Sequence, residues 1–114
     1  MIKVGVIGYG YWGPNLVRNF HQSGSTKLVG VSDIRQERLK EVTNRYPEVV
    51  VTTNYKDLLN NPEIEAVVIA TPVETHYSIA KEALEAGKHV LVEKPLTNTV
   101  SEAKDLVKIF RSSS

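Results

Sequence analysis

The chain has 114 residues and a formal net charge of +1, from 14 Lys and Arg against 13 Asp and Glu. This balance leaves no basic stripe for a nucleic-acid backbone, so we expect no nucleic-acid partner. The chain has no cysteine, and its three histidines match no metal-ligand spacing, so we expect neither disulfides nor a metal site. No apolar run approaches the ~20 residues of a membrane span, and a predicted strand occupies the position of a signal peptide. We therefore expect one soluble, cytoplasmic domain without a membrane partner.

The apolar runs of the chain are short, rich in Val and Ile, and nearly continuous. They predict strands at residues 4–7, 28–31, 49–52, 66–70 and 90–92. Continuous runs are typical of strands that are buried on both faces, as in a parallel sheet covered by helices.

Helical spacing of apolar residues fills the segments between these runs. It predicts helices around residues 16–20, 39–42, 79–84 and 101–110, and a short one at 55–60. Thr71-Pro72-Val73-Glu74 has the pattern of a capping box and predicts a helix start, and Gly87 predicts a left-handed helix end. The alternation predicts an α/β, Rossmann-type doubly wound parallel sheet of strand order 3-2-1-4-5. We expect one dinucleotide-binding domain at 1–114, with ligand along the carboxyl ends of strands 1 and 4.

The most informative motif is the GYGYWG run at residues 8–13. It follows a predicted strand, opens a predicted helix, and precedes Asp33 by about 20 positions, which is the context of a dinucleotide-binding fingerprint. Gly8 permits the tight turn, Gly10 lets a pyrophosphate approach the backbone, and Gly13 lets the helix pack closely. The alternative is a glycine-rich turn without a ligand.

The start of the first predicted helix is a candidate phosphate site. The backbone N–H groups of Tyr11, Trp12 and Gly13 have no partner within the helix, and the positive end of the helix dipole favours an anion there.

Asp33, Ile34 and Arg35 follow the second predicted strand and are candidates for contact with the adenosine half of a cofactor. A carboxylate at this position accepts hydrogen bonds from ribose hydroxyls and repels a 2′-phosphate, which favours NAD over NADP. Arg35 weakens this argument, because its guanidinium could turn to a 2′-phosphate or stack on adenine. Asp33 could instead cap the helix that begins near Arg35.

Glu93-Lys94-Pro95 follows the last predicted strand, at the edge of the sheet where doubly wound folds place their chemistry. Taken alone, Lys94 is as readily interpreted as a surface lysine at a strand end.

Together, four segments resemble the amino-terminal domain of the Gfo/Idh/MocA family, named for glucose–fructose oxidoreductase and inositol dehydrogenase. They are the glycine run 8–13, Asp33, Ala70-Thr71-Pro72 with His76, and Glu93-Lys94-Pro95. The resemblance implies an enzyme, a nicotinamide-dependent oxidoreductase that acts on a hydroxyl or ketone of a sugar, nucleotide sugar or cyclitol. Residues 10–16 are similar to members of the UDP-N-acetylglucosamine 3-dehydrogenase kind.

The same resemblance implies roles for single residues. Lys94 would be the catalytic lysine, and Thr71, Pro72, His76 and Glu93 would lie on the cofactor side. Helix capping explains Thr71 and Pro72 equally well, and packing of the third helix is an equal alternative for His76.

Family members continue into a sixth strand and a carboxy-terminal substrate domain that supports oligomers. We therefore expect those parts to be missing from this chain, the chain alone to be inactive, and the protein to form a homo-oligomer. Two other functions remain open: a free-standing NAD-binding module that senses redox state, and a methyltransferase that binds S-adenosylmethionine at its glycine-rich turn.

Overall fold

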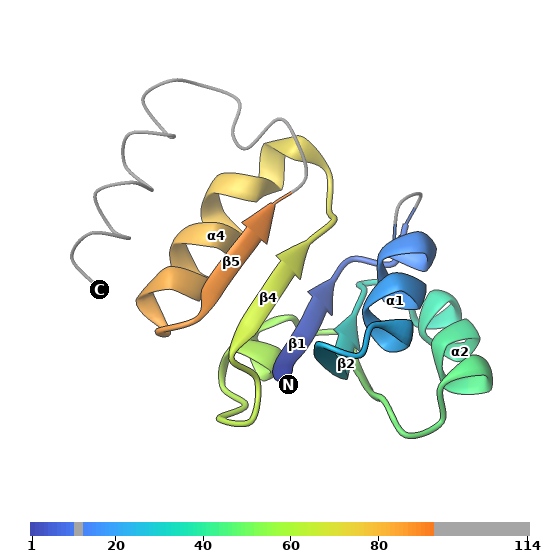
Figure 1. The fold of residues 1–114 in the computed structure, drawn as a ribbon. Helices are drawn as coiled ribbons and strands as arrows, with labels where there is room; N and C mark the ends of the chain where they lie inside the picture. Colours follow the sequence, from blue (N-terminus) through green and yellow to red (C-terminus); the bar gives the residue numbers. More distant parts are fainter. Residues whose placement is uncertain (11–12, 93–114) are drawn as a thin grey trace.

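The computed structural model describes residues 1–10 and 13–92 of the chain. In chain order its elements are β1 (Ile2–Ile7), α1 (Gly13–Gln22), β2 (Thr26–Ser32), α2 (Gln36–Arg45), β3 (Val50–Thr52), α3 (Lys56–Leu59), β4 (Ala66–Ile69), the 3-10 turn η1 (Val73–Thr75), α4 (His76–Glu85) and β5 (His89–Val92) (Figure 1). The helix predicted at residues 101–110 lies outside the described residues.

The five strands form one sheet of order β3-β2-β1-β4-β5, in which every pair is parallel. This confirms the predicted Rossmann-type α/β fold and its strand order. The order reverses between β1 and β4, where Ile7 is level with Ile69. In open parallel sheets such a reversal leaves a crevice at the carboxyl ends of the strands, and ligands bind there.

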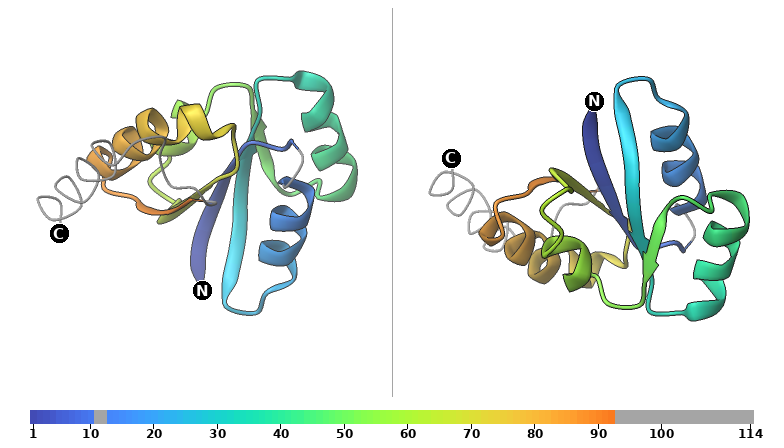
Figure 2. Two further views of the ribbon diagram at one scale, coloured as in Figure 1. Left: turned by 90° about the horizontal axis from the view of Figure 1, so that it is seen from above. Right: turned by 90° about the horizontal axis from the view of Figure 1, so that it is seen from below.

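Two apolar clusters cover the two faces of the sheet, as the continuous Val and Ile runs predict. On one face, α1 and α2 pack over Val4, Val6, Val31 and Val68. On the other, α3 and α4 pack over Ile7, Val67 and Ile69. The views along the sheet in Figure 2 show α1 and α2 on one side and α4 on the other. The strands thus carry the core, and their carboxyl ends are left for the site.

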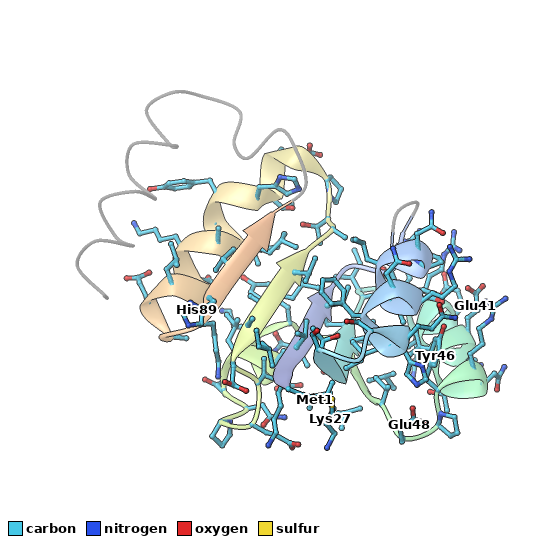
Figure 3. All side chains as sticks on the ribbon, in the orientation of Figure 1. Met1, Lys27, Glu41, Tyr46, Glu48 and His89 are labelled. Atoms are coloured by element: carbon cyan, nitrogen blue, oxygen red, sulfur yellow. The ribbon has the colours of Figure 1, made fainter. Side chains whose placement is uncertain are left out.

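The amino ends of the strands carry exposed charged side chains, among them Lys3 and Lys27, which both pair with Glu63. Figure 3 shows Met1, Lys27 and His89 at this edge of the sheet. The edge lies opposite to the one at which β1, β2 and β4 end.

The ends of α4 confirm one sequence prediction and correct another. Gly87 has φ +80°, and Lys88 N donates to Ala83 O at 3.0 Å, so the helix ends in the predicted left-handed glycine. The predicted start at Thr71-Pro72 is wrong, because η1 occupies residues 73–75 and the α-helix begins only at His76. The Thr75 hydroxyl donates to Pro72 O at 2.6 Å, which holds this segment as a tight turn.

Among the described residues, no helix has both the length and the apolar character that a membrane crossing requires.

Candidate dinucleotide-binding site

The turn after β1 is built around Gly8. Its φ of +104° is open to glycine, and a Cβ there would lie 2.9 Å from the backbone of Ala70 at the end of β4. Gly8 N donates to Ser32 O at 2.7 Å, and Ala70 N donates to Ile7 O at 2.8 Å. The turn is therefore held between the ends of β2 and β4, as the tight-turn interpretation of Gly8 requires.

The other two glycines of the motif differ in their surroundings. A Cβ on Gly13 would lie 2.8 Å from Gly8 O, so this glycine lets the start of α1 lie directly against the turn. A Cβ on Gly10 would meet only the Arg35 guanidinium, at 3.4 Å. The backbone of Gly10 is thus open to a ligand once that flexible side chain moves. Pro14 lies in the first turn of α1, where a helix tolerates a residue without a backbone N–H.

Tyr9 is a structural residue of the site that sequence reasoning missed. Its side chain is buried in the cluster beneath α1 and α2, while its backbone N donates to Asp33 Oδ2 at 2.8 Å. Burial raises the pKa of the Tyr9 hydroxyl above its ordinary value. A large aromatic residue between two motif glycines was the available signal, because such a side chain needs a core to enter.

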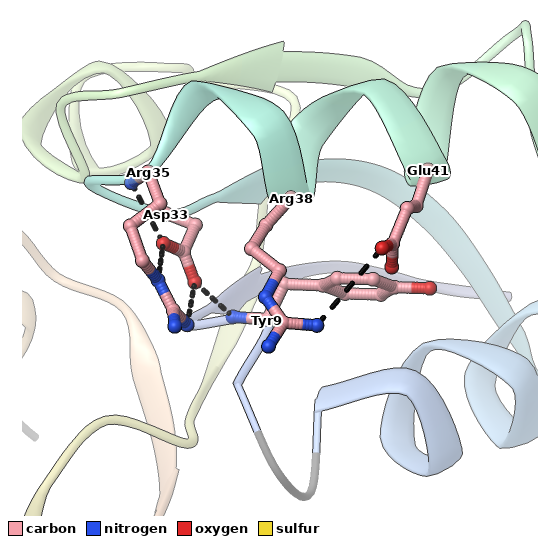
Figure 4. Close-up of polar contacts among 5 residues, drawn as sticks. All are labelled: Tyr9, Asp33, Arg35, Arg38 and Glu41. Carbon is pink, nitrogen blue, oxygen red and sulfur yellow. Dashed lines mark hydrogen bonds and ion pairs between the residues drawn. The ribbon is translucent and has the colours of Figure 1, made fainter.

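Asp33 lies directly after β2 and is buried, with 5% of its side chain exposed. Its Oδ2 accepts from Tyr9 N at 2.8 Å, and its Oδ1 accepts from Arg35 N at 2.8 Å (Figure 4). The Arg35 guanidinium adds bonds from Nε to Oδ1 at 3.2 Å and from Nη2 to Oδ2 at 3.4 Å. The carboxylate therefore joins the β1 turn to the start of the β2–α2 segment.

The electrostatics of Asp33 favour its charged form. Burial alone would raise the pKa of this carboxyl, but the hydrogen bonds from Arg35 and from the backbone of Tyr9 outweigh burial and lower it. Asp33 is not itself the N-cap residue of α2, which is Arg35, but its Oδ1 accepts from the backbone N–H of that residue, so the carboxylate also holds the start of this helix.

Ile34 and Arg35 border Asp33 on the solvent side. Ile34 is 87% exposed, which is unusual for a large apolar residue, and the Arg35 side chain is 44% exposed. An exposed apolar side chain beside a carboxylate at a strand end is suited to contact with a flat aromatic base.

The segment after β4 brings Thr71, Pro72 and His76 to the same edge of the sheet, next to Gly8. The Thr71 and Thr75 hydroxyls are 2.6 Å apart, and His76 Nε2 donates to Thr71 O at 2.7 Å. His76, the first residue of α4, is 3% exposed, so its ring is buried where the helix meets the turn before it. These contacts give His76 a structural part in shaping the turn, which fits the packing alternative.

The predicted site residues Tyr11, Trp12, Glu93 and Lys94 lie outside the described residues. β5 ends at Val92, which is level with Ile69, so the chain leaves β5 at the carboxyl edge of the sheet. Within residues 1–10 and 13–92, no group of three or more His, Cys, Asp and Glu side chains is placed to hold a metal ion.

The arrangement fits a dinucleotide. Gly8 and Gly13 bring the β1 turn against the start of α1, Gly10 leaves the backbone open beside it, and the Asp33 carboxylate lies at the neighbouring strand end. Phosphate at a helix N-terminus and ribose at an acidic strand end are the two contacts on which dinucleotide folds rely.

Comparison with known proteins points the same way. Residues 2–114 match the family model of the oxidoreductase family with an NAD-binding Rossmann fold, GFO_IDH_MocA. The chain is 40% identical over 116 residues to the uncharacterized oxidoreductase YdgJ of Escherichia coli, covering 97% of this chain and 32% of YdgJ. It is 36% identical over 111 residues to the scyllo-inositol 2-dehydrogenase (NADP(+)) IolW of Bacillus subtilis, covering 92% of this chain and 29% of IolW.

Among solved structures, the chain is similar to KijD10, a 3-ketoreductase from Actinomadura kijaniata in complex with NADP and TDP-benzene. The TM-score is 0.91 at 31% identity, and the match covers 98% of this chain and 34% of that one. The chain thus spans about a third of the length of the curated relatives that it matches. With a family model matched along almost its whole length and the glycine turn and Asp33 in place, the chain belongs to the Gfo/Idh/MocA oxidoreductases and has their NAD-binding Rossmann fold.

Proposed function

We propose that residues 1–114 are one dinucleotide-binding domain of a dehydrogenase that uses NAD in preference to NADP. The observation that carries the proposal is the convergence of Gly10, the start of α1 and the Asp33 carboxylate at the point where the strand order reverses. Bound nicotinamide would supply the hydride chemistry. The residues of this chain would hold the cofactor through Gly8–Gly13 and Asp33.

The preference for NAD rests on Asp33. The carboxylate is charged at neutral pH, the more so because its pKa is lowered, and a negative 2′-phosphate beside it would be repelled. Two relatives show that the family also uses NADP: IolW is named for it, and the KijD10 structure contains it. Asp33 therefore has to be tested in this chain.

The proposed substrate is a hydroxyl or ketone of a sugar, nucleotide sugar or cyclitol. Supporting it are the names of two relatives, an inositol dehydrogenase and a 3-ketoreductase whose structure contains TDP-benzene. We propose Lys94 as the catalytic lysine, since in sequence it comes shortly after Val92, where β5 ends at the same edge of the sheet as β1. An ammonium group near the reacting carbon would stabilise negative charge that develops on the substrate oxygen.

A binding titration tests the cofactor proposal. The chain is titrated with NADH, NADPH and S-adenosylmethionine, and binding is followed by calorimetry. We expect saturable binding of NADH, weaker binding of NADPH, and none of S-adenosylmethionine. Binding of S-adenosylmethionine without NADH would instead identify a methyltransferase-type site.

Lys94 is tested in the whole protein that carries this domain. Lys94→Ala is expected to lower turnover by about two or more orders of magnitude and to leave NAD affinity nearly unchanged, as for a group that acts mainly on the transition state. A loss confined to NAD binding would assign Lys94 to the cofactor. Binding of NADH by a whole protein without turnover on any polyol would favour a redox sensor.

We further propose a cytoplasmic homo-oligomer. β5 is paired only with β4 among the described residues, and a free strand edge favours pairing with another chain. Sedimentation at increasing protein concentration tests this, and a monomer at every concentration would contradict it.

A further inference from the structure

Tyr9 supplies the one side chain of the turn at residues 8–10, since both of its neighbours are glycines. A turn of this composition has many accessible backbone conformations, because glycine is the least restricted residue. A cofactor that binds one of these conformations loses affinity by ordering the turn, unless the fold has ordered it beforehand. The contacts that hold Tyr9 therefore decide how well the turn is prepared for a ligand.

The Tyr9 ring is held in the cluster beneath α1 and α2. The residue is 2% exposed, and its ring shares this cluster with Val17 of α1 and Val42 of α2. Figure 4 shows the ring extending from the turn along α2, next to Arg38 and Glu41. One side chain thus joins the turn to both helices.

The backbone of Tyr9 is held separately. Its N–H donates to Asp33 Oδ2 at 2.8 Å, and its Cβ would lie 3.4 Å from a Cβ on Gly13, so the first residue of α1 lies against it. With the amide and the ring both fixed, little freedom is left to the peptide unit that joins Tyr9 to Gly10. That unit carries the Gly10 N–H, and the backbone of Gly10 is the part of the turn that is open to a ligand.

We infer that Tyr9 is a positioning residue for the pyrophosphate: its buried ring fixes the glycine turn, and with it the Gly10 backbone and the start of α1, in the geometry that binds. The ring has this part and the hydroxyl does not, because the hydrogen bond of Tyr9 runs through its backbone while the ring makes apolar contacts. Both nicotinamide cofactors contain the same pyrophosphate, so Tyr9 affects the two affinities alike. The inference rests on the proposed dinucleotide site.

The inference predicts that affinity depends on the ring at position 9. In the chain, Tyr9→Phe is expected to bind NADH and NADPH within about twofold of the original affinities, since the ring stays in place. Tyr9→Leu is expected to weaken binding of both nucleotides by the same factor, at least about tenfold, because the turn must then be ordered on binding. Calorimetric titration measures the affinities, at a temperature where thermal unfolding shows each variant to be folded.

Val42→Ala is the matched control for a loss of core packing. Val42 is fully buried in the same cluster but lies in the second half of α2, away from the end of the helix that is next to Asp33. The substitution should lower the unfolding temperature, as Tyr9→Leu does, and leave both affinities within about twofold of the original values. A loss of affinity as large as that of Tyr9→Leu would show that the ring contributes stability alone, and would overturn the inference.

Hydrogen exchange without cofactor tests the positioning directly. The amides of residues 8 and 9 donate to Ser32 O and to the Asp33 carboxylate. Both should exchange with solvent faster in Tyr9→Leu than in Val42→Ala, because the turn then opens without the rest of the fold. Equal exchange in the two variants would mean that the ring does not hold the turn.

If Tyr9→Leu does not fold, Tyr9→Met replaces it in both measurements, since its flexible side chain fills the gap without fixing the turn. A folded variant of either kind that binds NADH as tightly as the original chain would overturn the inference while leaving the dinucleotide site intact. If the original chain binds neither nucleotide, the proposed function itself is wrong, and the exchange of the turn amides still decides whether the ring positions the turn.

Discussion

Gly8 and Gly10 lie two positions apart, yet they are glycines for different reasons. Gly8 has φ +104° and touches the Ala70 backbone, whereas the φ of Gly10 is not positive and its nearest neighbour is a flexible side chain. The first glycine is needed by the fold and the second by the proposed ligand.

The two alanine substitutions should therefore separate stability from binding. Gly8→Ala is expected to destabilise the fold by about 1 to 3 kcal/mol, because it places a side chain in a sparsely populated backbone region. Gly10→Ala should unfold at nearly the same temperature as the original chain but bind NADH at least about tenfold more weakly, since a methyl group would obstruct the pyrophosphate. Thermal unfolding and NADH titration give the two measurements. Equal losses of stability would contradict the distinction.

Asp33 should make stability depend on pH in the acid range. Its pKa is lower in the folded chain than the ordinary value of about 3.9, so its contribution is complete above about pH 4 and is lost as the pH falls through the folded value. Asp33→Asn is expected to cost about 1 to 3 kcal/mol at pH 7, because an amide cannot accept from both the Tyr9 and Arg35 amides. The difference from the original chain should shrink near pH 3 in urea unfolding. A difference that stays constant with pH would mean that the charge of Asp33 is not what stabilises the turn.

For single residues, the sequence predicted the position of Asp33 and the turn at Gly8. Both follow from the order in which a strand, a glycine run, a helix and an acidic residue occur along the chain. The pairing of Asp33 with Arg35 and the burial of Tyr9 depend on which way each side chain leaves a turn of unknown conformation. Neighbours in sequence do not determine that direction.

At the scale of elements, a side-chain contact links the short helix α3 to α4. The Tyr55 hydroxyl, just before α3, donates to the Glu82 carboxylate on α4, and the Tyr55 ring packs against the apolar cluster under α3 and α4. Burial first, and then the bond to Glu82, raise the pKa of Tyr55 to about 12. The contact joins segments that are 27 residues apart.

Tyr55→Phe removes this link without leaving a cavity. We expect a loss of about 1 kcal/mol in the free energy of unfolding, typical of one hydrogen bond. Since the pKa is raised on folding, the contribution is complete below about pH 10 and is lost as the pH rises through about 12. Absorbance of the tyrosinates between pH 9 and 13 should lose the step near pH 12 in the variant. A variant that keeps this step would show that another tyrosine titrates there.

The elements themselves were largely predictable. Four of the five strands contain short, nearly continuous apolar runs rich in Val and Ile, and parallel strands joined by right-handed crossovers leave few possible orders. The start of α4 was not predictable, because His76 and Thr75 bond to the carbonyls of Thr71 and Pro72 and stabilise a 3-10 turn where the capping pattern predicts an α-helix. Those bonds depend on the buried position of the His76 ring, which a local pattern does not contain.

For the whole molecule, the central strand is the shared part of both cores. Val4 and Val6 of β1 belong to the cluster under α1 and α2, and Ile7 belongs to the cluster under α3 and α4. The strand is hydrogen-bonded to β2 on one side and to β4 on the other. Neither core is complete without β1.

The position of β1 makes its amide protons a measure of ligand affinity. Because opening this strand means losing both cores, its amides should exchange with solvent deuterium only when the whole domain unfolds. A ligand that binds only the folded form slows such exchange by the factor 1 + [L]/Kd, which is about 100-fold at a concentration of 100 Kd. The exchange of Val4 and Val6 in the presence of NADH or NADPH should therefore report each affinity without a label, while exchange at the frayed ends of surface helices stays unchanged. If the two nucleotides slow the exchange of these amides unequally, the difference ranks their affinities. The measurement then comes from a strand that contacts neither nucleotide.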